Sequence, residues 1–343
     1  MNGSDFYCGN SSNGLCQLAL TSQIPAAYVH PTTKQCNYVY THPTSKQCNW
    51  EPSMDGYMKK TDLGVETVSL SSLAVGTVVN FGKHSINGET PWMIPWRIIK
   101  KNHRGYPSGS ITLIADQIID LRAFDAIEPN NPDSSRRGSG NNNWRYSNIR
   151  LWLNSSATSW YSAQHSYDAP PSTSASVNNQ NTQYQSRPGF LYNFTAAERN
   201  LILSTTITTV NNTVTDGGGS YTTTDKVFLP SETEMGLGNE NNIAEGTAFG
   251  YFTSNAVRVS AIYANAYRYS LSTSKPNTET SPWYYWLRTP TASNSYDVRS
   301  VDAGGSLYGN NAYNGHYGVR PCLNLPGTAT VTKFREWYDI VAG

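Results

Sequence analysis

Three short stretches near the C-terminal end of the chain decide its fold: WYYWLRTP at residues 283–290, VRSVDAGGSLY at 298–308 and GVRPCLNL at 318–325. The first and the last alternate between side chains for two faces, which is typical of strands. The middle stretch predicts a hairpin that turns at Ala303, Gly304 and Gly305. We expect the strands to contribute core side chains from Trp286, Leu287, Val298, Val301, Val319, Leu323 and Leu325.

Upstream of these stretches, strand-length apolar runs come before short capped helices. VSLSSLAVGTVVNFG, WMIPWRIIKKN and SGSITLIADQIIDLRAFDA, within residues 68–126, predict strands of one sheet. Two short helices are predicted from capping residues, Ser147 or Asn148 for the first and Thr195 with Glu198 for the second. A further helical turn is predicted from Ser231 with Glu234. Helices placed between strands, followed by a strand-rich C-terminus, predict an α+β domain.

Composition narrows the classes of function. Of the 343 residues only 14% are charged, with 25 Lys+Arg against 24 Asp+Glu, so electrostatic capture of nucleic acid or of an anionic membrane is not expected. Neither a signal peptide nor a membrane anchor is visible, because the first thirty residues are polar and no long apolar run follows. The 5 cysteines are an odd number, which favours synthesis in a reducing compartment over a disulfide framework.

The N-terminal region contains a short repeat, YVHPTTKQCN followed by YTHPTSKQCN. Each copy has a β-type dipeptide and a Pro-Thr turn, and segments this short cannot bury a core alone. We therefore predict an extended arm over residues 1–56 that attaches the chain and drives oligomerisation, followed by one domain over 57–343. A homo-oligomer is expected, with a trimer favoured and residues 28–50 near its axis.

The repeat also aligns two imidazoles and two thiols, which are the usual ligands of zinc: His30, Cys36, His42 and Cys48. Their spacing fits none of the common zinc patterns. A structural metal ion, or ordinary hydrogen-bonded side chains in a repeat, are the two interpretations.

A second candidate metal loop is GLGNENNIAEG at residues 236–246. It gathers oxygen ligands of the kind that calcium prefers, from Asn239, Glu240, Asn242 and Glu245. The spacing is not that of an EF-hand, and a loop held by side-chain to backbone hydrogen bonds is the alternative.

The chain resembles a known family through eight motifs in a fixed order: AVGTVVNFG, WRIIKKN, LIADQIIDLRAFDA, WRYSNIRLWLN, DKVFLPSETEMGLG and the three C-terminal stretches quoted above. This order is similar to that of prophage-associated DUF6273-type domains, over about residues 63–326. Those domains look like members of the C-type lectin fold, which includes the variable proteins of diversity-generating retroelements and the formylglycine-generating enzymes. The repeat is similar to segments of tail fibres from phages of Gram-positive bacteria. The resemblance implies a virion protein, a phage tail component whose lectin-like domain meets the host.

Two loops next to the C-terminal strands have the composition of a binding surface. Tyr presents a rigid amphipathic face, while Asn and Ser supply adaptable donors and acceptors, as in antibody loops. Changes at the adenines of an Asn codon give the residue types seen there, so diversification by a retroelement would produce such loops. The predicted ligand is a bacterial surface protein or glycan, and the predicted contact residues are Ser293, Asn294, Ser295, Tyr296, Asp297, Tyr308, Asn310, Asn311, Tyr313, Asn314, His316 and Tyr317. The same loops could instead form an oligomer contact or a solvated surface.

Three arginines lie inside the C-terminal strands: Arg288, Arg299 and Arg320. We expect each to pair with a carboxylate such as Asp297 or Asp302 and to fix the loop geometry, with direct ligand contact as the alternative.

Catalysis is not predicted. A formylglycine-generating enzyme needs a pair of thiols near its C-terminus, whereas Cys322 is the one cysteine after Cys48 and is expected to be a buried small side chain. The histidines are scattered, and no G-x-S-x-G or H-E-x-x-H motif is present. A carboxylate pair for sugar hydrolysis is a spatial arrangement that the sequence leaves open. The alternatives to a receptor-binding tail protein, which other tail proteins would contact, are a bacterial adhesin and a purely structural tail or baseplate protein.

Overall fold

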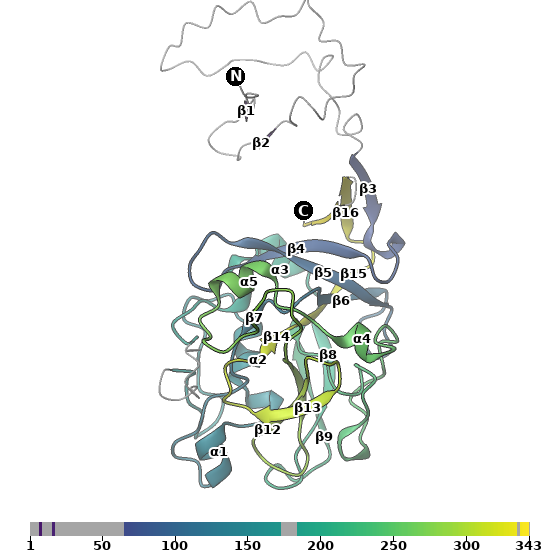
Figure 1. Ribbon diagram of the computed structural model, residues 1–343. Coiled ribbons are helices and arrows are strands. Elements are labelled where there is room, and N and C mark those ends of the chain that lie inside the picture. The colour runs from purple at the N-terminus through teal and green to yellow at the C-terminus, as the bar shows by residue number, and fades with distance from the viewer. Residues whose placement is uncertain (1–6, 9–15, 18–64, 173–183, 335–336, 343) are drawn as a thin grey trace, which may run out of the picture. The chain divides into compact units, whose positions relative to one another are not determined.

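The computed structural model describes residues 7–8, 16–17, 65–172, 184–334 and 337–342 (Figure 1). The chain divides into two compact units, Met1–Tyr57 and Met58–Gly343. In the first, β1 (Tyr7–Cys8) and β2 (Cys16–Gln17) pair antiparallel. The candidate metal ligands His30, Cys36, His42 and Cys48 and the predicted oligomer axis at 28–50 lie outside the described residues.

The described part of the second unit contains both helices and strands and is rich in strands. The prediction of a mixed, strand-rich domain is confirmed to that extent. Its larger sheet has eight strands, and all neighbours in it are antiparallel except β17 and β4. In spatial order the strands are β10 (Val227–Phe228), β15 (Cys322–Pro326), β6 (Ser110–Ala115), β5 (Trp92–Lys101), β4 (Val78–His84), β17 (Trp337–Val341), β16 (Thr330–Phe334) and β3 (Val65–Ser69). The predicted single sheet from the apolar runs after residue 68 is confirmed.

A second sheet has five strands and carries the predicted hairpin. Its spatial order is β13 (Leu307–Asn311), β12 (Asp297–Val301), β11 (Tyr285–Pro290), β14 (Gly318–Val319) and β7 (Asp120–Leu121). β8 (Thr205–Val210) and β9 (Ser220–Asp225) form a separate antiparallel pair. Figure 1 shows β12 and β13 at the end of this unit that is remote from β4 and β5.

The α-helices of the described residues are short: α1 (Ser134–Ser139), α2 (Asn148–Leu153), α3 (Ala196–Leu201), α4 (Asn255–Arg258) and α5 (Ala264–Tyr269). The predicted cap of α2 is Ser147, whose side chain accepts from the Arg150 N–H. The predicted capping box of Thr195 and Glu198 is present at α3.

The predicted helical turn at Ser231 is confirmed: the Met235 N–H donates to the Ser231 carbonyl at 3.0 Å, and the capping hydrogen bonds form. Ser231 Oγ accepts from the Glu234 N–H at 3.1 Å, and Glu234 Oε2 accepts from the Ser231 N–H at 3.0 Å. Gly236 then adopts a φ of 67°, in the left-handed region. The segment therefore ends as a single turn at the point where a helix would have continued.

The core lies between the sheets and the short helices. All seven side chains predicted for it from the C-terminal strands are fully buried. Cys322 is also buried, as predicted, and burial raises the pKa of its thiol well above the usual range. The largest fully buried side chains include Trp96, Trp144, Trp152 and Trp286.

Candidate functional site

The β12–β13 hairpin presents the C-terminal loops that the sequence singled out. In its register Tyr308 lies opposite Ser300, and Asn310 lies opposite Val298. β13 is at the edge of its sheet among the described strands. Because side chains alternate along a strand, Tyr308 and Asn310 project from the same face of the hairpin.

The turn of the hairpin is fixed by its own backbone. Asp302 Oδ1 accepts from the N–H groups of Gly304 and Ser306, at 2.8 Å each. Gly305 has a φ of 83°, and a Cβ there would lie 2.2 Å from the carbonyl oxygen of Asn255. Only glycine fits this close approach to α4. The hairpin is therefore a rigid support for the side chains that it carries.

Five aromatic side chains gather beside this hairpin, and we call them the aromatic face: Trp283, Tyr284, Tyr308, His316 and Tyr317. The ring centroid of Tyr284 lies 5.9 Å from that of Tyr308 and 5.4 Å from that of Tyr317. The imidazole of His316 lies 4.8 Å from the Tyr317 ring and 6.4 Å from the Trp283 ring. Tyr308 is 49% exposed, whereas the other four side chains of the aromatic face are half-buried or buried.

His316 is held in this face as a neutral ring. Burial lowers the pKa of His316 to about 4. Its Nδ1 is buried and has no hydrogen-bond partner in the described part of the chain. The backbone carbonyl of His316 accepts from Trp283 Nε1 at 2.8 Å, which fixes its position. The neutral imidazole thus packs against the half-buried Trp283 ring and the buried Tyr317 ring, and its Nδ1 has no partner among the described residues there.

Three of the predicted contact residues are buried, which places their side chains out of reach of a ligand. Tyr317 is 2% exposed, Ser295 3% and Asn314 4%. The hydroxyl of Tyr317 accepts from Asn310 Nδ2 at 2.8 Å, and Asn314 Nδ2 donates to Asn310 Oδ1. These side chains hold the loop together from within and support the aromatic face.

The other predicted contact residues lie at the opposite end of the hairpin. Asp297 pairs with Asn311 in the register, and the Ala312 N–H donates to the Tyr296 carbonyl at 2.9 Å. In this group Ser293 is exposed, whereas Asn294, Tyr296, Asp297, Asn311 and Tyr313 are half-buried. The structure therefore separates the predicted set into the aromatic face and a loop next to α1.

That loop is held by an asparagine. Asn142 Nδ2 lies within hydrogen-bond distance of three carbonyl oxygens, those of Asn294 at 2.9 Å, Asp297 at 3.0 Å and Thr291 at 3.3 Å. Its own Oδ1 accepts from Asn212 Nδ2 at 3.0 Å. Asn142 is fully buried. One amide thus connects three segments that are remote in sequence.

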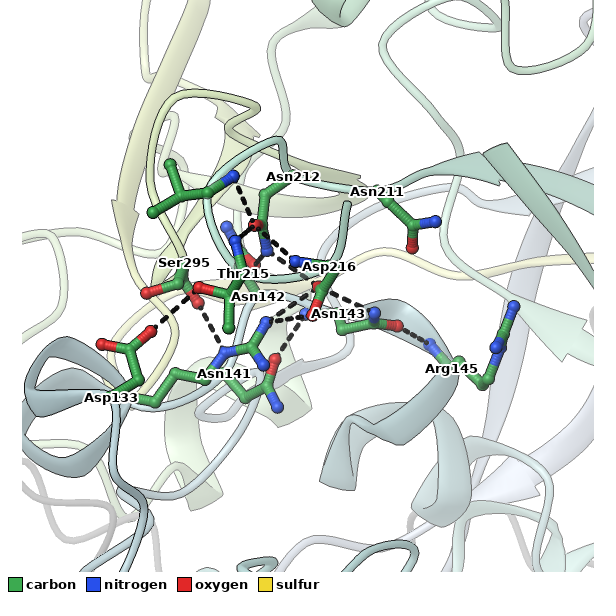
Figure 2. Close-up of polar contacts among 12 residues, drawn as sticks. Asp133, Asn141, Asn142, Asn143, Arg145, Asn211, Asn212, Thr215, Asp216 and Ser295 are labelled. Carbon is green, nitrogen blue, oxygen red and sulfur yellow. Dashed lines mark hydrogen bonds and ion pairs between the residues drawn. The ribbon is translucent and has the colours of Figure 1, made fainter. Parts of the chain in front are cut away.

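Figure 2 shows the carboxylate around which these segments meet, that of Asp216. It accepts from Arg136 Nη2 at 2.8 Å, from Asn212 Nδ2 at 2.8 Å and from Asn143 Nδ2 at 2.9 Å. Arg136 Nε also donates to the Ser295 carbonyl at 3.2 Å. The network sets the position of residues 293–297 from two other loops, and the sequence analysis missed it.

Two of the strand arginines pair with carboxylates, as predicted, but with partners that were not named. Arg288 Nη1 lies 2.6 Å from Glu234 Oε2, with both side chains buried. Arg299 Nη2 lies 2.7 Å from Glu240 Oε2, on the face of β12 away from the aromatic side chains. Both acids come from the segment after β10, so the arginines tie the second sheet to that segment.

The prediction that Asp297 or Asp302 pairs with these arginines is therefore wrong. Asp302 is used by the turn of the hairpin, and Asp297 Oδ2 accepts from Asn294 Nδ2 at 2.8 Å. Arg320 departs further from the expectation, because within the described residues it forms no ion pair and donates to backbone carbonyls and to the Tyr285 hydroxyl.

A buried carboxyl pair lies behind the hairpin. Burial, with the neighbouring Glu240 carboxylate, raises the pKa of Glu232 to about 7, against the opposing effect of Arg299. Glu232 Oε2 is buried without a hydrogen-bond partner in the described part of the chain, and the Arg299 Nε lies 3.9 Å from it. Glu232 is thus the carboxyl group of this pair that binds a proton near neutral pH.

The candidate calcium loop uses its oxygen atoms internally. Glu240 accepts from Arg299 and from the Ala292 N–H, and Glu245 accepts from the Val210 N–H and the Thr289 hydroxyl. Across the described ranges, no group of three or more His, Cys, Asp or Glu side chains could hold a metal ion. The hydrogen-bonded loop that was the alternative interpretation accounts for these contacts.

Comparison with protein families shows which family the chain belongs to. A family model described as a domain of unknown function, DUF6273, matches residues 109–327, and the chain belongs to this family. The matched segment includes the aromatic face, the Asp216 network and the Arg288–Glu234 pair. No curated protein and no solved structure matches the chain. In the described part of the chain, no helix combines the length and the apolar character needed to cross a membrane.

Proposed function

We propose that the chain is a receptor-binding component of a phage tail, with a C-type lectin-like domain that binds a bacterial surface ligand through the aromatic face. The observation that supports this proposal most directly is Tyr308, 49% exposed on an edge strand and 5.9 Å from Tyr284. Exposed aromatic side chains on a rigid support are the groups that carry most affinity in binding surfaces.

The chemistry of the face favours a ligand without net charge. Its members are neutral: four aromatic rings of Trp and Tyr, and an imidazole whose pKa is lowered to about 4. The exposed Tyr308 hydroxyl supplies hydrogen bonds, while the accessible rings supply stacking area. A sugar ring or a protein loop of the host surface offers both kinds of contact. The proposed role is recognition without catalysis.

Two alternative functions would also use the aromatic face. A bacterial adhesin would bind a surface ligand in the same way, and a structural tail or baseplate protein would pack the face against another virion protein. The resemblance of the N-terminal repeat to tail fibre segments favours location in the virion, with diversification by a retroelement as the source of the Tyr- and Asn-rich loops.

The proposed assembly is a homotrimer formed through the N-terminal arm. Small extended repeats need partners to bury apolar surface, and closed symmetry is the rule for homo-oligomers. Light-scattering mass measurement on the full-length chain is expected to give three copies over a range of concentrations. A concentration-independent monomer would contradict the assembly.

The experiment that tests the function is binding of the purified full-length chain to bacterial cells, compared between the natural protein and Tyr308→Ala. Selective loss of binding at unchanged oligomer mass supports recognition of a host ligand. Loss of the oligomer with the same substitution would instead identify the aromatic face as an assembly contact.

A further inference from the structure

A cavity of about 470 Å³ is lined by side chains from β5, from the segment that follows β6, from the segment around α4 and from Arg320. Its polar lining comes from Arg97, Asp116, Gln117, Ser260 and Arg320, and its apolar lining includes Val257. The volume is within the range of small-molecule sites, roughly 300–1,000 Å³. None of the predicted contact residues lines it. We call it the Arg320 cavity.

Arg320 in its wall is a buried cation with only neutral partners. It is 3% exposed, and it donates to the carbonyls of Ala115 and Asp116 at 3.0 Å each and to that of Arg258 at 3.3 Å. No carboxylate of the described residues forms an ion pair with it, whereas the equally buried Arg288 has Glu234. A buried charge is costly when no opposite charge compensates it.

The neighbouring groups do not supply the missing negative charge. Arg97 Nε donates to Asp116 Oδ1 at 2.6 Å, so the one carboxylate in the lining is already used by the other arginine. Two guanidinium groups and one carboxylate leave the lining with one positive charge in excess. The side-chain amide of Gln117 also lines the cavity and forms no hydrogen bond within the described residues.

We propose that the Arg320 cavity binds a small carboxylate-bearing molecule of about the size of a hexuronic acid. The excess positive charge of the lining compensates the carboxylate, because guanidinium groups attract planar anions. Gln117 and Ser260 offer hydrogen bonds to hydroxyl groups, and Val257 contacts the apolar side of the ligand. This site is independent of the aromatic face and of the function proposed for it.

Isothermal titration of the full-length chain with glucuronate tests the proposal, with glucose and inorganic phosphate titrated in parallel. The expected result is saturable binding of glucuronate and none of glucose, because only the carboxylate meets the positive charge. Absence of glucuronate binding, equal binding of glucose, or binding of phosphate in preference to glucuronate would overturn it.

Two substitutions of opposite charge at Gln117 distinguish a direct effect on the ligand from an effect on folding. Gln117→Glu is expected to weaken glucuronate binding about ten-fold or more, and Gln117→Lys to strengthen it, since this side chain has no hydrogen bond to lose. Arg104→Gln removes a positive charge from an exposed residue outside the cavity and is expected to change nothing. A shift in the same direction for both Gln117 variants, or no shift in either, would contradict the assignment.

Discussion

The ring of Tyr317 stacks on the ring of Trp286, with centroids 4.2 Å apart and planes inclined by 21°. Trp286 is fully buried and donates from Nε1 to the Arg122 carbonyl at 2.9 Å, so it is fixed in the core. Tyr317 in turn contacts Tyr284 and His316. The aromatic face therefore rests directly on the hydrophobic core, and its geometry is set by the packing beneath it.

The first prediction concerns this support. Trp286→Ala should lower the free energy of unfolding of the domain by about 3–5 kcal/mol, because it leaves a large cavity and removes the stack. Tyr317→Phe keeps the stack and loses only the hydroxyl that accepts from Asn310, so about 0.5–1.5 kcal/mol is expected. Denaturant unfolding measures both. Unchanged stability of Trp286→Ala would show that the ring is not part of the core.

The second prediction concerns the loop at residues 293–297. Asn142→Ala removes the amide that bonds two carbonyls of this segment and that of Thr291 and leaves those groups without this partner, so a loss of about 1–3 kcal/mol is expected. Amide hydrogen exchange should then increase in residues 293–297 more than in β5 and β6. Asn87→Ala is the matched control, since the Asn87 side chain is exposed. Equal exchange in the loop of both variants would contradict the role of Asn142.

The third prediction is a pH dependence of stability. Folding raises the pKa of Glu232 to about 7, above its ordinary value near 4.5, so the folded state binds more protons between these two values. The stability contributed by the protonated carboxyl group is fully present below about 4.5 and is lost as the pH rises through about 7. The free energy of unfolding of the natural protein should therefore fall over this interval relative to that of Glu232→Gln.

The difference between the two proteins is the quantity to measure, because other groups titrate in the same interval. His316, whose pKa is lowered to about 4, has the opposite effect: its contribution is lost as the pH falls below about 6.5. Glu245, whose pKa burial raises to about 7, acts in the same direction as Glu232. Parallel pH profiles of the natural protein and Glu232→Gln would show that Glu232 does not titrate in this range.

Local patterns predicted much of the fold. Alternation placed all seven chosen C-terminal side chains in the core, and Gly304 and Gly305 marked the hairpin turn, because these signals depend on residues close in sequence. The cap at Ser147 was predicted for the same reason. The helical turn at Ser231 was predicted from its capping pair, and Gly236 ends the segment after that turn.

The tertiary partners could not be predicted from the same signals. Glu234 was recognised as a capping residue, yet it also pairs with Arg288, which is 54 positions away in the chain. The Asp216 network joins three loops in the same way (Figure 2). Trp283 and Tyr284 were in a quoted stretch, and the alternation that buries Trp286 also puts Tyr284 on its face. That signal could have added Tyr284 to the candidate site.

The central claim is that the aromatic face binds a host ligand, and Tyr308→Ala tests it most directly. We predict about thirty-fold weaker binding of the full-length chain to host cells, since a central aromatic side chain contributes about 2 kcal/mol, with stability within roughly 0.5 kcal/mol of the natural protein. Tyr167→Ala, at a tyrosine that is 40% exposed on another loop, is the matched control and should bind normally. Host-cell binding that survives Tyr308→Ala, or that falls equally in Tyr167→Ala, would contradict the claim.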